Sequence, residues 1–170
     1  MGLDVTAYER AERISGHEPT DDDHDHGIIE AFAYAVFDRA LDGMGDTVLD
    51  TRTGVDCLSA GYWRTGGDEA TAQTSYAGYG LYRDRLARAV IGMEYRKLLN
   101  FIGQHGDAPY FDLLNFADNE GVIGPVAARR LADDFASTPV KFDEAWMNKF
   151  HDDLRDCFDL AADTGLALFG

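Results

Sequence analysis

The spacing of apolar residues changes along the chain, and this change limits the folds open to it. Near the start, Leu3, Val5 and Ala7 alternate with Asp4 and Thr6, a period of two that is typical of a half-buried β-strand. In the second half apolar residues recur about every four positions, which is typical of amphipathic helices. The sequence therefore predicts an α+β fold, in which a small, mainly antiparallel sheet from the N-terminal half is packed by helices of the C-terminal half.

The longest helix is expected to begin at Thr138-Pro139 and to stop at Thr164-Gly165. Its apolar residues are four apart and should face the core: Phe142, Trp146, Phe150, Leu154 and Phe158. Further helices are expected from Leu81 to about Gly92 and through residues 95–102. A short helix should follow an N-cap at Asp107, with Pro109 in its first turn, and another should begin at Gly124-Pro125. For residues 28–37 we prefer a strand, although a helix is also compatible, and turns at 43–46 and 53–54 would bound further short strands.

The bulk composition fits one globular domain over residues 1–170, with an exposed acidic loop at about 18–27. The chain has 170 residues, of which 45% are hydrophobic, and this is enough to bury a substantial core. No apolar run approaches the roughly 18–20 residues of a membrane span, and the first residues lack the pattern of a secretory signal. Cys57 and Cys157 are far apart, so neither a disulfide framework nor a zinc site is expected. We expect an intracellular protein.

The charge balance is strongly acidic. The formal net charge is −16, from 15 basic and 31 acidic residues. A GC-rich genome or adaptation to high salt would explain this bias. A third explanation is an acidic decoy that imitates nucleic acid and occupies a DNA-binding partner. Direct binding of DNA or RNA is disfavoured over most of such a surface.

Two segments have the composition of a ligand site. Residues 61–88 combine glycines, aromatic rings and the arginines 64, 83, 85 and 88, and residues 115–125 form a polar loop that ends at a helix N-terminus. Aromatic faces stack on bases, arginine binds phosphate, and amides or carboxylates can contact ring edges. The predicted ligand-binding residues are Trp63, Arg64, Tyr76, Tyr79, Arg83, Asn115, Asp118, Asn119 and Glu120. We expect them to surround one concave site, within a subunit or between subunits; the alternative is ordinary sheet aromatics, surface ion pairs and helix caps.

No residue pattern predicts catalysis or a cofactor. The serines lie outside any Gly-x-Ser-x-Gly motif, and no phosphate-binding Gly-x-x-x-x-Gly-Lys is present. His24 and His26 are weak candidates for zinc, nickel or manganese ligands, but they are only two residues apart. We therefore prefer a solvated loop there, expect no cofactor, and lean against an enzyme.

Three segments resemble one family. They are Met-Gly-Leu-Asp-Val-Thr-Ala-Tyr at residues 1–8, Ser-Tyr-Ala-Gly-Tyr-Gly-Leu-Tyr-Arg-Asp-Arg-Leu-Ala at 75–87, and Leu-Leu-Asn-Phe-Ala-Asp-Asn-Glu-Gly-Val-Ile-Gly-Pro at 113–125. Together these three blocks are similar to small uncharacterised phage and prophage proteins. The resemblance implies a viral origin and a location in the host cytoplasm. It brings no established activity, but it favours a counter-defence role.

Three functions follow from these observations. The first is a non-catalytic protein that sequesters a small nucleotide-like ligand, such as a host immune signal, and forms a homo-oligomer if the site lies between subunits. The second is an acidic interaction protein, or nucleic-acid mimic, that blocks a host protein. The third is an enzyme of unrecognised type that acts on a nucleotide-related substrate. None of the three involves a membrane.

Overall fold

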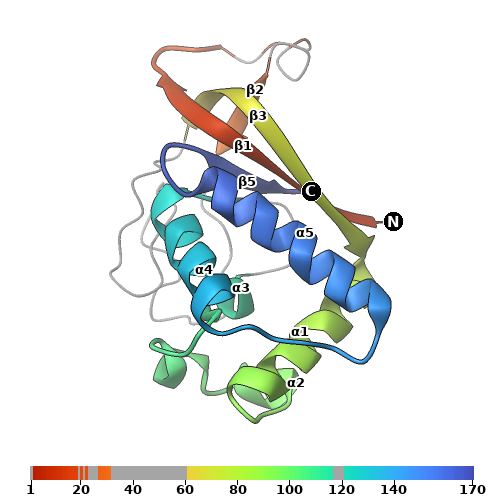
Figure 1. Ribbon diagram of the computed structural model, residues 1–170. Coiled ribbons are helices and arrows are strands. Elements are labelled where there is room, and N and C mark those ends of the chain that lie inside the picture. Colours follow the sequence, from red (N-terminus) through yellow and green to blue (C-terminus); the bar gives the residue numbers. More distant parts are fainter. Residues whose placement is uncertain (1, 19, 21, 23–26, 32–60, 117–120) are drawn as a thin grey trace.

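The computed structural model describes residues 2–18, 20, 22, 27–31, 61–116 and 121–170. Strands β1 (Gly2–Ile14), β2 (Ile28–Ala31), β3 (Gly61–Ser75), β4 (Gly121–Ile123) and β5 (Leu166–Phe169) form one antiparallel sheet in the order β2-β3-β1-β5-β4. The main helices are α1 (Tyr76–Val90), α3 (Phe111–Asn115), α4 (Pro125–Ser137) and α5 (Ala145–Ala161). Shorter ones are α2 (Tyr95–Leu98) and the 3-10 helix η2 (Ile102–His105). The α+β prediction is confirmed, and the two strands β4 and β5 join the sheet from the C-terminal half (Figure 1).

The helices pack on one face of the twisted sheet, where α5 crosses β1 and β3 (Figure 1). The predicted alternation in β1 holds, because Leu3, Val5 and Ala7 are all fully buried in the main core. Across the sheet, Val5 is paired with Phe169 of β5 and with Ala72 of β3, and both partners belong to the same core. This core fills the space between the sheet and the helices.

The opposite face of the sheet carries a second apolar cluster. Its buried members are Ile29, Trp63, Val122 and Leu166, with Tyr8, Ala11 and Leu168 packed against them. Tyr8 and Leu166 are directly paired across β1 and β5. Because successive side chains of a strand point to opposite faces, these residues lie on the face turned away from Ala7 and the helices.

Several predicted helix boundaries are wrong. α1 begins at Tyr76 rather than Leu81, because Ser75 caps it by accepting a hydrogen bond from the Gly78 N–H at 2.9 Å. α5 begins at Ala145 rather than after Pro139, and α3 begins at Phe111 after Tyr110, whose φ is 60°, rather than at an Asp107 cap. The segment expected to be helical over 95–102 contains only the one-turn helix α2 and the start of η2. The predicted start of α4 at Gly124-Pro125 is confirmed.

The inward face of α5 differs from the predicted stripe. Phe150, Leu154 and Phe158 are buried as expected, whereas Trp146 is 41% exposed. A spacing of four advances about 400° around a helix with 3.6 residues per turn, so such a series drifts off the core face. Met147, fully buried, occupies the inward position instead. Phe142 is buried but precedes the helix.

The turn between α5 and β5 brings the chain close to β1. Thr164 pairs with Arg10 in an isolated bridge. A Cβ added at Gly165 would lie within a bond-like distance of the Tyr8 carbonyl oxygen, so only glycine fits there. α5 ends at Ala161, before the predicted stop at Thr164-Gly165, and glycine is required at position 165 by this packing against β1. Residues 32–37 of the preferred strand and the turns at 43–46 and 53–54 lie outside the described residues.

Candidate functional site

Arg83 lies at the centre of the aromatic–arginine segment and is buried. It follows Tyr79 by one helical turn on α1, so the two side chains share a face. Its guanidinium carbon is 4.4 Å from the centre of the Tyr79 ring and 4.7 Å from that of Tyr95. Its Nη1 donates a hydrogen bond to the Phe116 carbonyl oxygen at 2.9 Å. Arg83 therefore links α1, α2 and the end of α3 from inside the core, with both rings in cation–π range.

Asn115 lies next to this contact. It ends α3, is fully buried, and precedes the Phe116 carbonyl that Arg83 binds. The structure therefore brings Tyr79, Arg83 and Asn115 together, although in a buried region rather than around a concave site. The remaining predicted residues of that loop, Asp118, Asn119 and Glu120, lie outside the described part of the chain.

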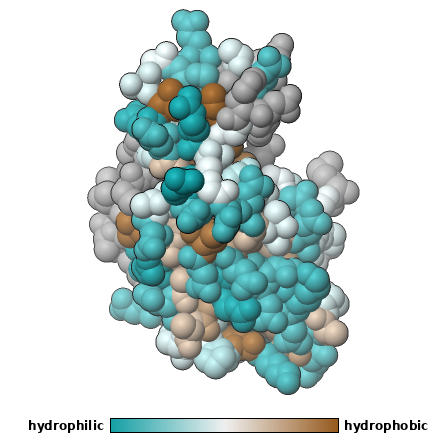
Figure 2. Space-filling view, turned by 45° about the horizontal axis from the view of Figure 1, so that its top comes forward, coloured by the Kyte–Doolittle hydropathy of each residue, from teal (hydrophilic) through white to brown (hydrophobic). Residues whose placement is uncertain are grey.

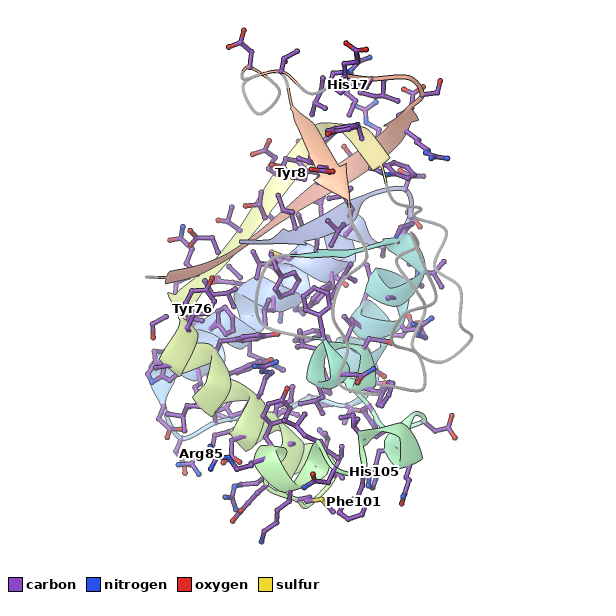
Figure 3. The ribbon with its side chains drawn as sticks, turned by 180° about the vertical axis from the view of Figure 1, so that it is seen from behind. Tyr8, His17, Tyr76, Arg85, Phe101 and His105 are labelled. Carbon is purple, nitrogen blue, oxygen red and sulfur yellow. The ribbon has the colours of Figure 1, made fainter. Side chains whose placement is uncertain are left out.

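Trp63, Arg64 and Tyr76 do not join this region. Trp63 packs with Leu166 and Val122 on the far face of the sheet, whereas Tyr79 contacts Phe169 on the helix face. Arg64 is exposed on β3. Tyr76 starts α1 beside the end of β3, as Figure 3 shows, and is partly buried.

The prediction of one concave site formed by these segments within the chain is therefore wrong. The sheet separates Trp63 from Tyr79, because their clusters lie on its two faces. Tyr79 is fully buried and Arg83 is 3% exposed, so neither presents a free surface to a stacked base. That these residues bind a ligand, alone or between subunits, stays a prediction.

The buried titratable groups are poorly suited to chemistry near neutral pH. The Nδ1 of His151 lies 2.8 Å from the Tyr82 hydroxyl oxygen among aromatic rings. Burial lowers the pKa of His151 to about 4 and raises that of the Cys157 thiol to about 12. The imidazole is therefore neutral, and the thiol is not ionised.

No metal site is formed by the described residues, where no group of three or more His, Cys, Asp or Glu side chains converges. The weak candidates His24 and His26 lie outside that part of the chain. None of the described helices combines the length and the apolar character needed to cross a membrane.

Two surface grooves were not predicted from the sequence. The first has a volume of about 410 Å³ and runs between β3 and α5; it is lined by Thr71, Gln73, Thr74, Trp146, Lys149, Phe150 and Asp153. The second, about 360 Å³, lies beside the C-terminal half of α1; it is lined by Arg85, Arg88, Ala89, Lys141, Phe142, Asp143 and Glu144. Figure 3 shows Arg85 on α1, beyond Tyr76 and further from the sheet.

The first groove follows an open strand edge. β2 pairs with β3 only over Gly61–Arg64, and the N–H and the hydroxyl of Thr65 both donate to the Gly27 carbonyl, at 2.7 and 2.9 Å. Beyond Thr65, no strand in the described part of the chain pairs with this edge of β3. The sequence signal for this edge is the period-two run Ala70-Thr71-Ala72-Gln73-Thr74, in which Ala72 is buried and Thr71 and Gln73 are exposed.

Acidic residues dominate the outer surface of α5. Arg155 is held by Asp152 and Asp156, each at 3.0 Å, and Lys149 by Asp153 at 2.5 Å. Hydrophilic side chains cover most of the face seen in Figure 2, and hydrophobic ones form small, separate patches there. The basic residues of α5 are therefore already paired, and its acids exceed them.

Comparisons with protein-family models, curated proteins and solved structures find no match to this chain. The candidate site therefore rests on the geometry alone.

Proposed function

We propose that this protein is a non-catalytic, acidic interaction protein that binds a basic partner protein. One observation carries the proposal: Tyr79 and Arg83, which lie at the centre of the segment that suggested a ligand site, are buried in the core, while many acidic side chains are exposed. Arg83 is buried, and Arg130 forms two hydrogen bonds to the buried carboxylate of Asp112, at 2.9 and 3.0 Å. The chain keeps a net charge of −16.

The exposed acids are spread over several elements. They include Asp4 and Glu12 on β1, Asp68 and Glu69 on β3, Asp133 on α4, and Asp152, Asp156 and Asp159 on α5. A surface of this sign attracts basic proteins and speeds their association. It also resembles the phosphate backbone in charge, which is the basis for a nucleic-acid mimic. The resemblance to phage proteins suggests a setting in the host cytoplasm, where the partner would be a defence protein that binds nucleic acid.

A second candidate is the sequestration of a small nucleotide-like ligand, and the groove beside α1 favours it. Arg85, Arg88 and Lys141 line that groove, and a phosphate group would find cations there. Against this, Asp143 and Glu144 line the same groove, and Arg88 already contacts Asp84 and Glu94 at 2.9 and 3.2 Å. The balance of charge therefore makes this the weaker proposal.

A displacement assay separates the two. A fluorescent DNA duplex is bound to each member of a panel of basic DNA-binding domains at about 0.15 M salt, and the protein is titrated in. We expect it to release the duplex from at least one domain, because acidic side chains compete with phosphates for the same surface. A parallel thermal-shift series with linear and cyclic nucleotides tests the second candidate. Retention of every duplex, together with stabilisation by a nucleotide, would replace our proposal with the second one.

A further inference from the structure

The open edge of β3 presents backbone groups whose direction follows from the sheet. The N–H of Asp4 donates to the Gly170 carbonyl at 2.8 Å, and the N–H of Gly170 donates to the Asp4 carbonyl at 3.0 Å. The backbone groups of Asp4 thus point away from β3. Because both groups of a residue point to the same side and residues alternate in an antiparallel strand, those of Val5 point toward β3.

The same alternation gives the outward residues of β3. Val5 is paired with Ala72, so the N–H and C=O of Ala72 point toward β1. Those of Thr71 and Gln73 therefore point to the outer edge. These two residues line the groove, and an added strand could form about four backbone hydrogen bonds with them.

α5 supplies the second wall of the groove. The Trp146 side chain is 41% exposed and lies over the start of α1, where a Cβ added at Gly78 would be 3.6 Å from its ring. One and two turns further along α5 are Lys149 and Asp153, paired at 2.5 Å, with 76% of the Lys149 side chain exposed. Side chains of a segment bound in the groove would thus contact the aromatic surface of Trp146 at one end and the carboxylate of Asp153 further along α5.

Residues 70–75 of this edge lack two of the residue types that commonly protect the edges of sheets. Residues 70–75 contain no lysine and no proline, the residues that commonly prevent strand addition. The residues that precede them are Asp68 and Glu69, both exposed, at a register shift between β1 and β3. They would repel an acidic strand and attract a basic one.

We propose that β3 accepts an extended, basic segment of the partner protein as an added strand, bonded to Thr71 and Gln73. This inference rests on the proposed function, and it gives the basic partner a binding mode, the addition of a strand to the sheet. Side chains on one face of the segment would pack on Trp146 and reach Asp153, with Lys149 turning outward to solvent. Binding of a second copy of this chain at the edge is disfavoured, because two chains that each carry a net charge of −16 would repel each other.

The test uses a labelled decapeptide that alternates arginine and valine, titrated into the protein by fluorescence anisotropy at about 0.15 M salt. Gln73→Pro removes the outward N–H without removing a bond to β1, and Gln73→Ala is the matched control that keeps it. We expect Gln73→Pro to weaken binding at least tenfold and Gln73→Ala to change it less than threefold. The same peptide with N-methyl groups on alternate residues should also bind the wild type at least tenfold more weakly, a result that does not depend on how the variant folds.

Hydrogen exchange in the complex locates the peptide. The amides of Thr71 and Gln73 should become protected when the peptide is added. Equal binding of the plain and N-methylated peptides, or no new protection at these two amides, would overturn the added strand and leave the acidic-partner proposal in place. No peptide binding at all would also overturn it, and the duplex-displacement assay then decides the proposed function separately.

Discussion

At the scale of single residues, Phe150 and Trp146 of α5 differ in how far their side chains are buried. Phe150 is 2% exposed and contacts Tyr79 and Tyr82 edge-on, whereas Trp146 is 41% exposed. We expect Phe150→Ala to lower the free energy of unfolding by about 3–5 kcal/mol and Trp146→Ala by less than about 1 kcal/mol. Urea denaturation of both variants measures this, and equal losses would contradict the difference in burial between the two side chains.

His151 should make the stability depend on pH. Its pKa is lowered by burial from 6.5 to about 4, so the unfolded chain binds a proton at a pH where the folded chain does not. The contribution of neutral His151 to the free energy of unfolding is therefore fully present above pH 6.5 and is lost as the pH falls toward 4. The neighbouring charges, Asp152 and Arg155, act on the pKa in opposite directions.

The measurement is the urea midpoint between pH 7 and 4 for the wild type, His151→Gln and His105→Gln. The wild type and His105→Gln should lose stability more steeply than His151→Gln over this interval. His105 is the control because it is only partly buried and lies at the end of the short helix η2, where Figure 3 labels it. Parallel curves for all three proteins would show that His151 is not held neutral.

The sequence predicted contacts between residues better than it predicted their exposure. The sequence assigned Tyr79 and Arg83 to one ligand-binding segment, and the structure does bring them together on α1, but the sequence could not show that Tyr95 covers the guanidinium from another element. Likewise, Trp146 and Phe150 fit one apolar repeat, and only the packing of α5 on the sheet separates them. Burial depends on partners distant in sequence, and the local pattern does not contain them.

At the scale of elements, the two edges of β3 should differ in hydrogen exchange. In the free protein, the amides of Ala70 and Ala72 point toward β1 and should exchange slowly, whereas those of Thr71 and Gln73 point outward and should exchange fast. Amide exchange followed by NMR measures this alternation residue by residue. Uniform protection along Ala70–Gln73 would show that the outer edge is already occupied.

Element types were easier to predict than element ends. The period-two pattern of β1 and the Gly124-Pro125 start of α4 are both confirmed. The start of α5 was misplaced because Thr138-Pro139 has the chemistry of a helix start, yet the chain stays non-helical to Glu144. β3 was missed as a strand because its glycines and arginines suggested a ligand loop. The groove beside it needs α5 as a second wall, so no local pattern could reveal it.

At the scale of the whole molecule, the charge should oppose folding. A net charge of −16 concentrates repulsion in the compact state, and salt screens it. We therefore expect the melting temperature to rise by several degrees between about 0.02 and 0.5 M NaCl. Scanning calorimetry measures it, with a variant carrying Asp133→Asn, Asp152→Asn and Asp159→Asn as the control, whose rise should be smaller. A fall in melting temperature with salt would mean that ion pairs outweigh repulsion.

The position of β5 has a consequence for how the protein is made. Residues 166–169 insert between β1 and β4, and β1 also pairs with β3. The central strand is thus synthesised first, while one of its two neighbours emerges from the ribosome more than 150 residues later. At about 5–20 residues per second, β1 has been synthesised roughly ten seconds or more before the strand β5 that pairs with one of its edges. Contacts of such long sequence separation slow folding, and the pairing of β1 with β5 cannot form until the last strand has been synthesised.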